Sequence, residues 1–146
     1  MCAADAIIVG HITSSVYHLS AAGTGVYGDY IVVIDRLLKY NQAASIPSKA
    51  GIVVTRPGGS LLLPEGLVNF DVQGFPPFES GAGYVQFLRY IPQSSAYQAI
   101  NELSTLIAKQ TNWVIAHKKF DQLVMPGFTR GVLEDTISKW VASCLS

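Results

Sequence analysis

Charge is scarce in this chain of 146 residues, and its absence excludes several classes of protein. Only 14% of the residues are charged, against about 25% in typical soluble domains. Ten basic and ten acidic residues cancel without forming a basic run, so the electrostatic footprint of a nucleic-acid-binding protein is missing. No apolar run reaches ~18 residues, so we predict no transmembrane segment.

The spacings typical of catalytic and metal sites are also absent. The sequence has no Cys-x-x-Cys pair, no zincin spacing among His11, His18 and His117, and no Gly-x-Ser-x-Gly nucleophile elbow. We expect a half-buried, hydrogen-bonded His11, with His18 and His117 exposed. We therefore assign no catalytic residue, no metal and no cofactor. A Ser-His-Asp site assembled from separate loops stays open, because geometry rather than spacing defines a triad.

One glycine-rich run, residues 23–28, formally matches the pattern Gly-x-Gly-x-x-Gly. A dinucleotide site needs this run directly after a strand and at the start of a helix. Here the strand formers of residues 30–34 follow it instead. We interpret residues 23–28 as a loop between two strands.

Short segments of β-branched and aromatic residues predict a β-rich domain. Pro64-Glu65-Gly66 predicts the turn of a hairpin, and Pro57-Gly58-Gly59 ends the strand before it. The predicted strands cover residues 6–13, 30–34, 51–56, 60–63, 67–72 and 84–91. Such a series of short strands is typical of a small barrel or sandwich.

Residues 96–109 are ambiguous between helix and strand. Their apolar positions fit a helical stripe, yet residues 104–119 also read as two strands around Gln110-Thr111-Asn112. We favour the hairpin over 104–119. The ambiguity matters because it decides whether a second helix is present.

A C-terminal helix is predicted over about 129–144. Thr129 follows Pro126-Gly127 and is a candidate N-cap. Apolar residues recur at helical spacing on one face, which we expect to pack on the sheet. These residues are Leu133, Ile137, Trp140, Val141 and Cys144.

The two cysteines, Cys2 and Cys144, bracket almost the whole chain. A disulfide that closes a loop of more than 100 residues stabilises by roughly 4–5 kcal/mol and persists only in an oxidising compartment. We favour this pairing, and with it an exported protein, periplasmic or extracellular, whose signal peptide has been removed and replaced by Met1. Two unrelated thiols in a cytosolic protein, or a lipid anchor on Cys2, are the alternatives.

Three phenylalanines, Phe70, Phe75 and Phe78, cluster around Pro76-Pro77. Exposed aromatic residues on such a loop would contact a partner. The alternative is a loop that is tucked over the open end of a barrel. The sequence leaves both interpretations open.

A series of motifs runs through residues 4–91. It consists of Ala4-Asp5-Ala6-Ile7-Ile8-Val9-Gly10-His11-Ile12, Asp29-Tyr30-Ile31-Val32-Val33-Ile34, Leu37-Leu38-Lys39, Ile52-Val53-Val54 with Pro57-Gly58-Gly59, and Pro77-Phe78 with Gly81 before Tyr84-Val85-Gln86-Phe87-Leu88. This series resembles a widespread group of uncharacterised exported bacterial proteins. A more distant similarity is to the netrin-like, OB-type barrels of metalloproteinase inhibitors. These motifs are structural rather than catalytic.

The chain departs from both patterns at several positions. The Leu-Lys-Gly step of the bacterial group is Leu38-Lys39-Tyr40 here, and its acidic residue after Gly81 is Ala82. The inhibitors use many disulfides and a free N-terminal cysteine that binds zinc, whereas Met1 precedes Cys2 in this chain. Inhibitor activity and family site residues therefore do not carry over.

The resemblance implies an exported, OB-like antiparallel β-barrel. With the C-terminal α-helix predicted from the helical spacing, we expect a mainly β fold that forms one domain over residues 1–146. We predict a non-enzymatic domain that binds another protein or an envelope polymer, and not nucleic acid. A small hydrolase with a loop-assembled site is one alternative. A self-assembling structural envelope protein is the other, because low charge and apolar strands favour edge pairing and homo-oligomers.

Overall fold

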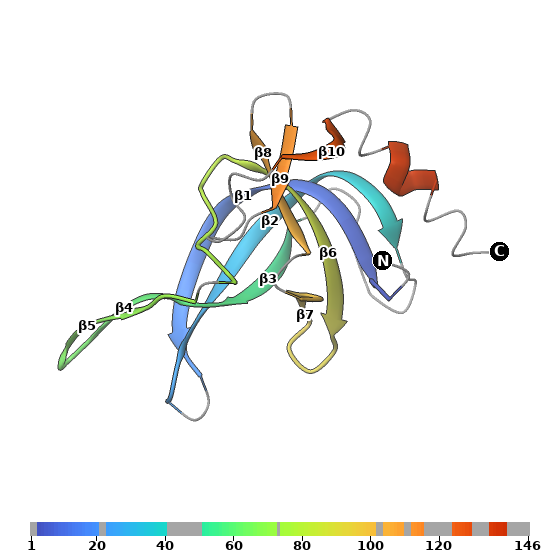
Figure 1. Ribbon diagram of the computed structural model, residues 1–146. Coiled ribbons are helices and arrows are strands. Elements are labelled where there is room, and N and C mark those ends of the chain that lie inside the picture. Colours follow the sequence, from blue (N-terminus) through green and yellow to red (C-terminus); the bar gives the residue numbers. More distant parts are fainter. Residues whose placement is uncertain are drawn as a thin grey trace.

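The computed structural model describes residues 3–20, 23–40, 51–72, 74–101, 104–109, 112–115, 124–129 and 135–139. These residues form a mainly β structure with one short helix, residues 135–139, near the C-terminus (Figure 1). The strands are β1 (Ala6–Leu19), β2 (Val26–Tyr40), β3 (Gly51–Pro57), β4 (Gly59–Leu63), β5 (Gly66–Phe70), β6 (Gly83–Ile91), β7 (Ala96–Ala99), β8 (Thr105–Lys109), β9 (Asn112–Ile115) and β10 (Val124–Thr129).

Five strands close into a barrel-like sheet, which we call the closed sheet. β1 pairs with β2, β2 with β3, β3 with β7, β7 with β6, and β6 returns to β1. All of these pairs are antiparallel except β3–β7, which is parallel and joined only at Val54 and Tyr97. This is the Greek-key order of an OB-like barrel, so the predicted fold class is confirmed.

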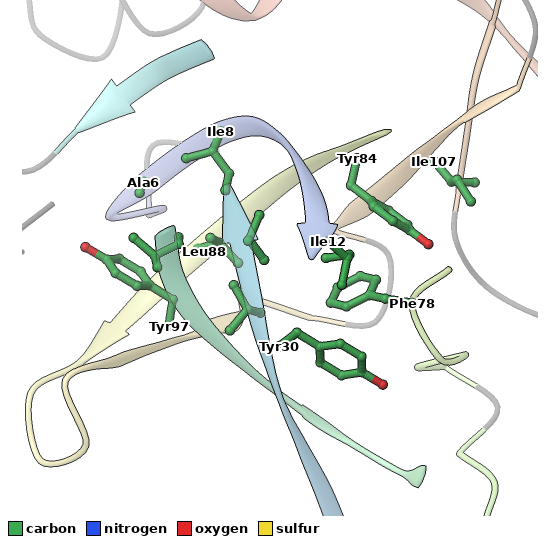
Figure 2. Close-up of a cluster of buried hydrophobic side chains, with 12 residues drawn as sticks. Ala6, Ile8, Ile12, Tyr30, Phe78, Tyr84, Leu88, Tyr97 and Ile107 are labelled. Carbon is green, nitrogen blue, oxygen red and sulfur yellow. The ribbon is translucent and has the colours of Figure 1, made fainter. Parts of the chain in front are cut away.

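The N-terminal part of the first strand, residues 6–9 of β1, is apolar without alternation and is buried on both faces, whereas Thr13 to Val16 are exposed. Ala6, Ile8 and Ile12 pack in the interior cluster of the closed sheet (Figure 2). Ile7 and Val9 pack in a second cluster outside it. A strand that is covered on both faces reads as a continuous apolar run, as residues 6–9 do here.

The outer cluster joins β1 and β6 to the C-terminal part of the chain. Leu106 of β8, Trp113 of β9 and Ile137 of the helix are all buried there with Ile7 and Val85. Ile137 has no exposed surface, so the prediction that the helix packs on the sheet holds for the described turn.

The predicted start of the helix at Thr129 is wrong. Thr129 is the last residue of β10 and pairs with Asn112 of β9. Pro126-Gly127 is compatible with β10 because this strand is at the edge of the described sheet and its register shifts between Val124 and Thr129. The other apolar helix positions, Leu133, Trp140, Val141 and Cys144, lie outside the described residues.

Within the ambiguous segment 96–109, residues 96–99 and 105–109 are strands, and none of the described residues of the segment is helical. β7 completes the closed sheet, and β8 and β9 form an antiparallel hairpin, which confirms the hairpin predicted within 104–119 as far as Ile115. The apparent helical stripe arises because the segment contains two separate strands with buried apolar residues. These are Ala96, Tyr97, Leu106 and Ile107.

The hairpin predicted around Pro64-Glu65-Gly66 is confirmed as β4–β5, which we call the arm (Gly59–Phe70). Figure 1 shows the arm projecting away from the closed sheet. Its base requires a glycine, because Gly59 has a φ of +135° and a Cβ there would overlap carbon atoms of the Tyr17 ring. Gly66 near the tip has a similar φ of +132° but faces open space.

We expect Gly59→Ala to lower the free energy of unfolding by about 1–3 kcal/mol more than Gly66→Ala, because only the first methyl group overlaps Tyr17. Both substitutions add comparable backbone strain, of order 1–3 kcal/mol. Urea unfolding followed by circular dichroism measures the difference. Equal losses would mean that Tyr17 moves aside at little cost.

Candidate functional site

The arm exposes large aliphatic side chains. Leu62 and Leu67 lie directly opposite each other in the β4–β5 ladder, with 77% and 64% of their surfaces exposed. Glu65 at the turn is the arm's one charged residue. Adjacent exposed leucines on a projecting element are typical of a contact surface, whereas single exposed leucines need no explanation.

More apolar surface lies near the base of the arm. Phe70, the last residue of β5, is 42% exposed. Val16 and Leu19 are exposed on the outer half of β1, beyond His11, where its pairing with β6 ends. β4 lies against β1 and β2, and the Tyr17 ring of β1 lies beside Gly59 at the base of the arm.

The three phenylalanines of the predicted contact loop have different environments. Only Phe70 is exposed, while Phe75 is half-buried. Phe78 is buried in the interior cluster, between Tyr30 and Tyr84, with 4.7 Å between ring centroids on each side (Figure 2). Phe78 therefore fits the alternative prediction of a loop tucked over the end of the barrel. Of the three phenylalanines, only Phe70 is exposed enough to contact a partner.

Arg56 of β3 holds this loop in place. Its Nε–H donates a hydrogen bond to the carbonyl oxygen of Pro76, at 2.9 Å. Its Cζ lies 4.4 Å from the centroid of the Phe78 ring and 5.2 Å from that of Phe75. These distances are those of cation–π contacts. Burial lowers the pKa of Arg56 to about 10, so the guanidinium is still charged at pH 7.

The sequence reading missed Arg56 as a buried residue. A charged residue at the end of a strand, followed by Pro57-Gly58, is usually exposed. The period of two along β3 was the available signal, because it places Arg56 on the same face as Ile52 and Val54.

His18 takes part in a chain of polar contacts on the outside of β1, β2 and β3. Its Nε2 lies 3.2 Å from Oδ2 of Asp29, and the Thr55 hydroxyl donates to Oδ1 of the same carboxylate, at 2.7 Å. The acid thus lies between the histidine and the hydroxyl. In a hydrolytic triad the histidine lies between them, so this arrangement cannot pass the hydroxyl proton to His18.

His11 is half-buried and hydrogen-bonded, as predicted, with its Nδ1 3.0 Å from Oδ2 of Asp35, and His18 is exposed, as predicted. His117 lies outside the described residues. Among the residues that are described, no three His, Cys, Asp or Glu side chains come together as metal ligands.

The glycine-rich run at 23–28 is only partly the predicted loop. Residues 23–25 lie between β1 and β2, but residues 26–28 already belong to β2, where they pair with Tyr17 to Leu19 of β1. The Ser20 hydroxyl oxygen accepts hydrogen bonds from the backbone N–H groups of Thr24 and Gly25, both at 3.2 Å. These two donors therefore point at Ser20. A phosphate-binding loop would direct its N–H groups at a ligand, at the start of a helix.

No protein-family model, curated protein or solved structure matches this chain. Within the described ranges, no helix has the length and apolar character needed to cross a membrane. The OB-like assignment therefore depends on strand order, and the resemblance to exported bacterial barrels stays a prediction.

The contacts of His18 predict a titration above pH 6.5. The hydrogen bond from Nδ1 to the Leu19 carbonyl raises its pKa most, and Asp29 raises it further. This contribution to folding stability is fully present below pH 6.5, the unfolded value, and is lost as the pH rises through the folded pKa. Asp29→Asn should lower the titration midpoint in NMR without removing the effect of Leu19.

Asp35→Asn is the matched control for this titration, since Asp35 pairs with His11 instead. It should leave the His18 midpoint where it is in the unmodified protein. If the titration midpoint of His18 is the same in the Asp29→Asn variant as in the unmodified protein, the contact between His18 and Asp29 is contradicted.

Proposed function

We propose that this chain is a non-enzymatic, exported binding domain that contacts a protein partner through the arm. The observation that carries the proposal is the exposed pair Leu62 and Leu67 on a projecting hairpin. Each buried leucine contributes roughly 1.5–3 kcal/mol, so the pair with Phe70 provides enough apolar area for a specific but modest contact.

The backbone of the arm supports the same proposal. Within the described part of the chain, β4 and β5 pair only with each other. Their outer edges therefore present N–H and C=O groups to which an extended segment of a partner can add as a strand. An isolated two-stranded hairpin is only marginally stable in water, so a partner would also stabilise the arm.

The two other candidate functions differ in their support. A hydrolase gains none from His18, because Asp29 separates it from Thr55. A self-assembling structural protein is supported by the same exposed leucines, with a second copy of the chain as the partner. Crosslinking from the arm distinguishes a second copy of the chain from a different protein.

A photo-crosslinking amino acid, p-benzoylphenylalanine, placed at position 62 should give one discrete adduct in the producing cells. The same amino acid at position 94, in the exposed turn before β7, should give none. Leu67→Asp should abolish the adduct at 62, because it introduces a charge opposite the crosslinker while leaving the buried core unchanged.

The mass of the adduct identifies the partner class. A heterologous protein supports the proposal. An adduct of twice the chain mass that disappears on dilution supports self-assembly instead, and an adduct with a glycan supports the envelope polymer. Equal labelling from positions 62 and 94 would contradict a role for the arm.

Export is proposed on the cysteine pair and the low charge. Cys2 and Cys144 lie outside the described residues, so their disulfide stays a prediction. Alkylation of the native protein, followed by intact mass, should label no thiol until a reductant is added. Labelling of both thiols without reductant would mean that the termini are not joined, and the cytosolic alternative would be favoured.

A further inference from the structure

A pocket of about 210 Å³ opens beside the β3–β7 seam, where a single residue pair joins the two strands. Residues of β2, β3, β7 and the Phe75 loop line it. Its wall is mostly apolar, with Tyr27, Pro57 and Phe75, and Arg56 is the one charged residue among the lining positions. The volume is below the ~300–1,000 Å³ of pockets for drug-sized ligands, so the occupant is small.

Arg56 has no anionic partner among the described residues. Of its five N–H donors, Nε–H is used by Pro76, and no described carboxylate lies within ion-pair distance. The ionisable neighbours that influence it are the phenols Tyr30 and Tyr84. Both are neutral at pH 7 because a phenol has an ordinary pKa of 10.0, and burial raises the pKa of both further. A buried cation without an anion costs free energy, so an anion that enters the pocket would be stabilised.

We propose that the Arg56 pocket binds a small apolar monocarboxylic acid, with its carboxylate on the guanidinium and its apolar body against Tyr27 and Phe75. The planar guanidinium fork matches a carboxylate in a bidentate geometry. The apolar wall favours an acid with an aromatic or branched body over a fully hydrated anion such as phosphate. This site is independent of the arm and of its partner.

Asp29, on the outside of β2, does not compete for this site. Asp29 lies beside Thr55, which lines the pocket, but its carboxylate is already bonded to the Thr55 hydroxyl and to His18. Its charge is therefore partly balanced by His18 rather than directed at Arg56.

Benzoate is the probe, and benzamide is its neutral control of the same shape. We expect benzoate to bind the unmodified protein at least about tenfold more tightly than benzamide in an NMR titration, because a charge-assisted pair is roughly twice as strong as a neutral one. Inorganic phosphate should bind more weakly than benzoate. Equal binding of benzoate and benzamide, or tighter binding of phosphate, would overturn the proposal.

Two variants assign the binding to this pocket. Arg56→Met keeps the length of the side chain without its charge and should remove the preference for benzoate, whereas Arg56→Lys should retain part of it. Ala99→Leu fills the pocket without changing Arg56 and should reduce benzoate binding by about tenfold or more.

The test remains decisive if the Arg56 variants fail to fold. The Ala99→Leu variant then tests whether benzoate binds in the pocket. Ser94→Leu is its matched control, because position 94 is exposed and outside the pocket. Circular dichroism checks that each variant keeps the β structure. Benzoate binding that is unchanged by Ala99→Leu would place the acid elsewhere on the protein and contradict the proposal.

Discussion

The antiparallel pairing of β1 with β6 is the constraint on which the rest of the structure depends. It runs from Ala6 opposite Leu88 to His11 opposite Gly83 and closes the sheet. The backbone N–H of Asp5 extends it with a 2.8 Å bond to the Leu88 carbonyl, and the Asp5 carboxylate accepts a bond from the N–H of Tyr90. Because the two strands have one face in each hydrophobic cluster, separating them would open both clusters at once.

Closure in this order leaves the chain between β3 and β6 free for other roles. The arm takes up the first part of this connection and projects outward, while Phe78 turns back into the interior cluster. Arg56, the penultimate residue of β3, bonds to Pro76 near the end of the same connection. One short segment therefore provides both the exposed apolar surface and the cover over the barrel end, and the pocket lies where this cover meets the weakly joined β3–β7 seam.

Local signals in the sequence predicted the positions of most strands and turns but not the lengths of the two longest strands, since β1 was expected over 6–13 and β2 over 30–34. Local composition is sufficient to predict the strands that begin at residues 6 and 51 and the turn at Pro64-Glu65-Gly66. The prediction that the helix begins at Thr129 was wrong because Pro126-Gly127 is compatible both with the start of a helix and with an irregular edge strand. Only the pairing of β10 with β9 decides between the two.

The features that make the candidate sites depend on contacts between distant segments. The burial of Arg56 results from a loop some twenty residues further along the chain. Phe70 and Phe78 share the same local composition, yet one is exposed and the other is packed between Tyr30 and Tyr84. No local pattern distinguishes them, because the difference depends on which side of the closed sheet the connecting chain crosses.

The two-sided burial of β1 has a consequence for how the protein is made. During synthesis β1 leaves the ribosome with β2, its local hairpin partner, but its second partner β6 follows only after most of the barrel has been translated. Until then Ile7, Ile8 and Val9 have an unpaired edge and an uncovered face, and such long-range pairing is intrinsically slow. The nascent chain therefore passes through a stage in which its most apolar strand is open to association, and it is at this stage that a chaperone would protect it.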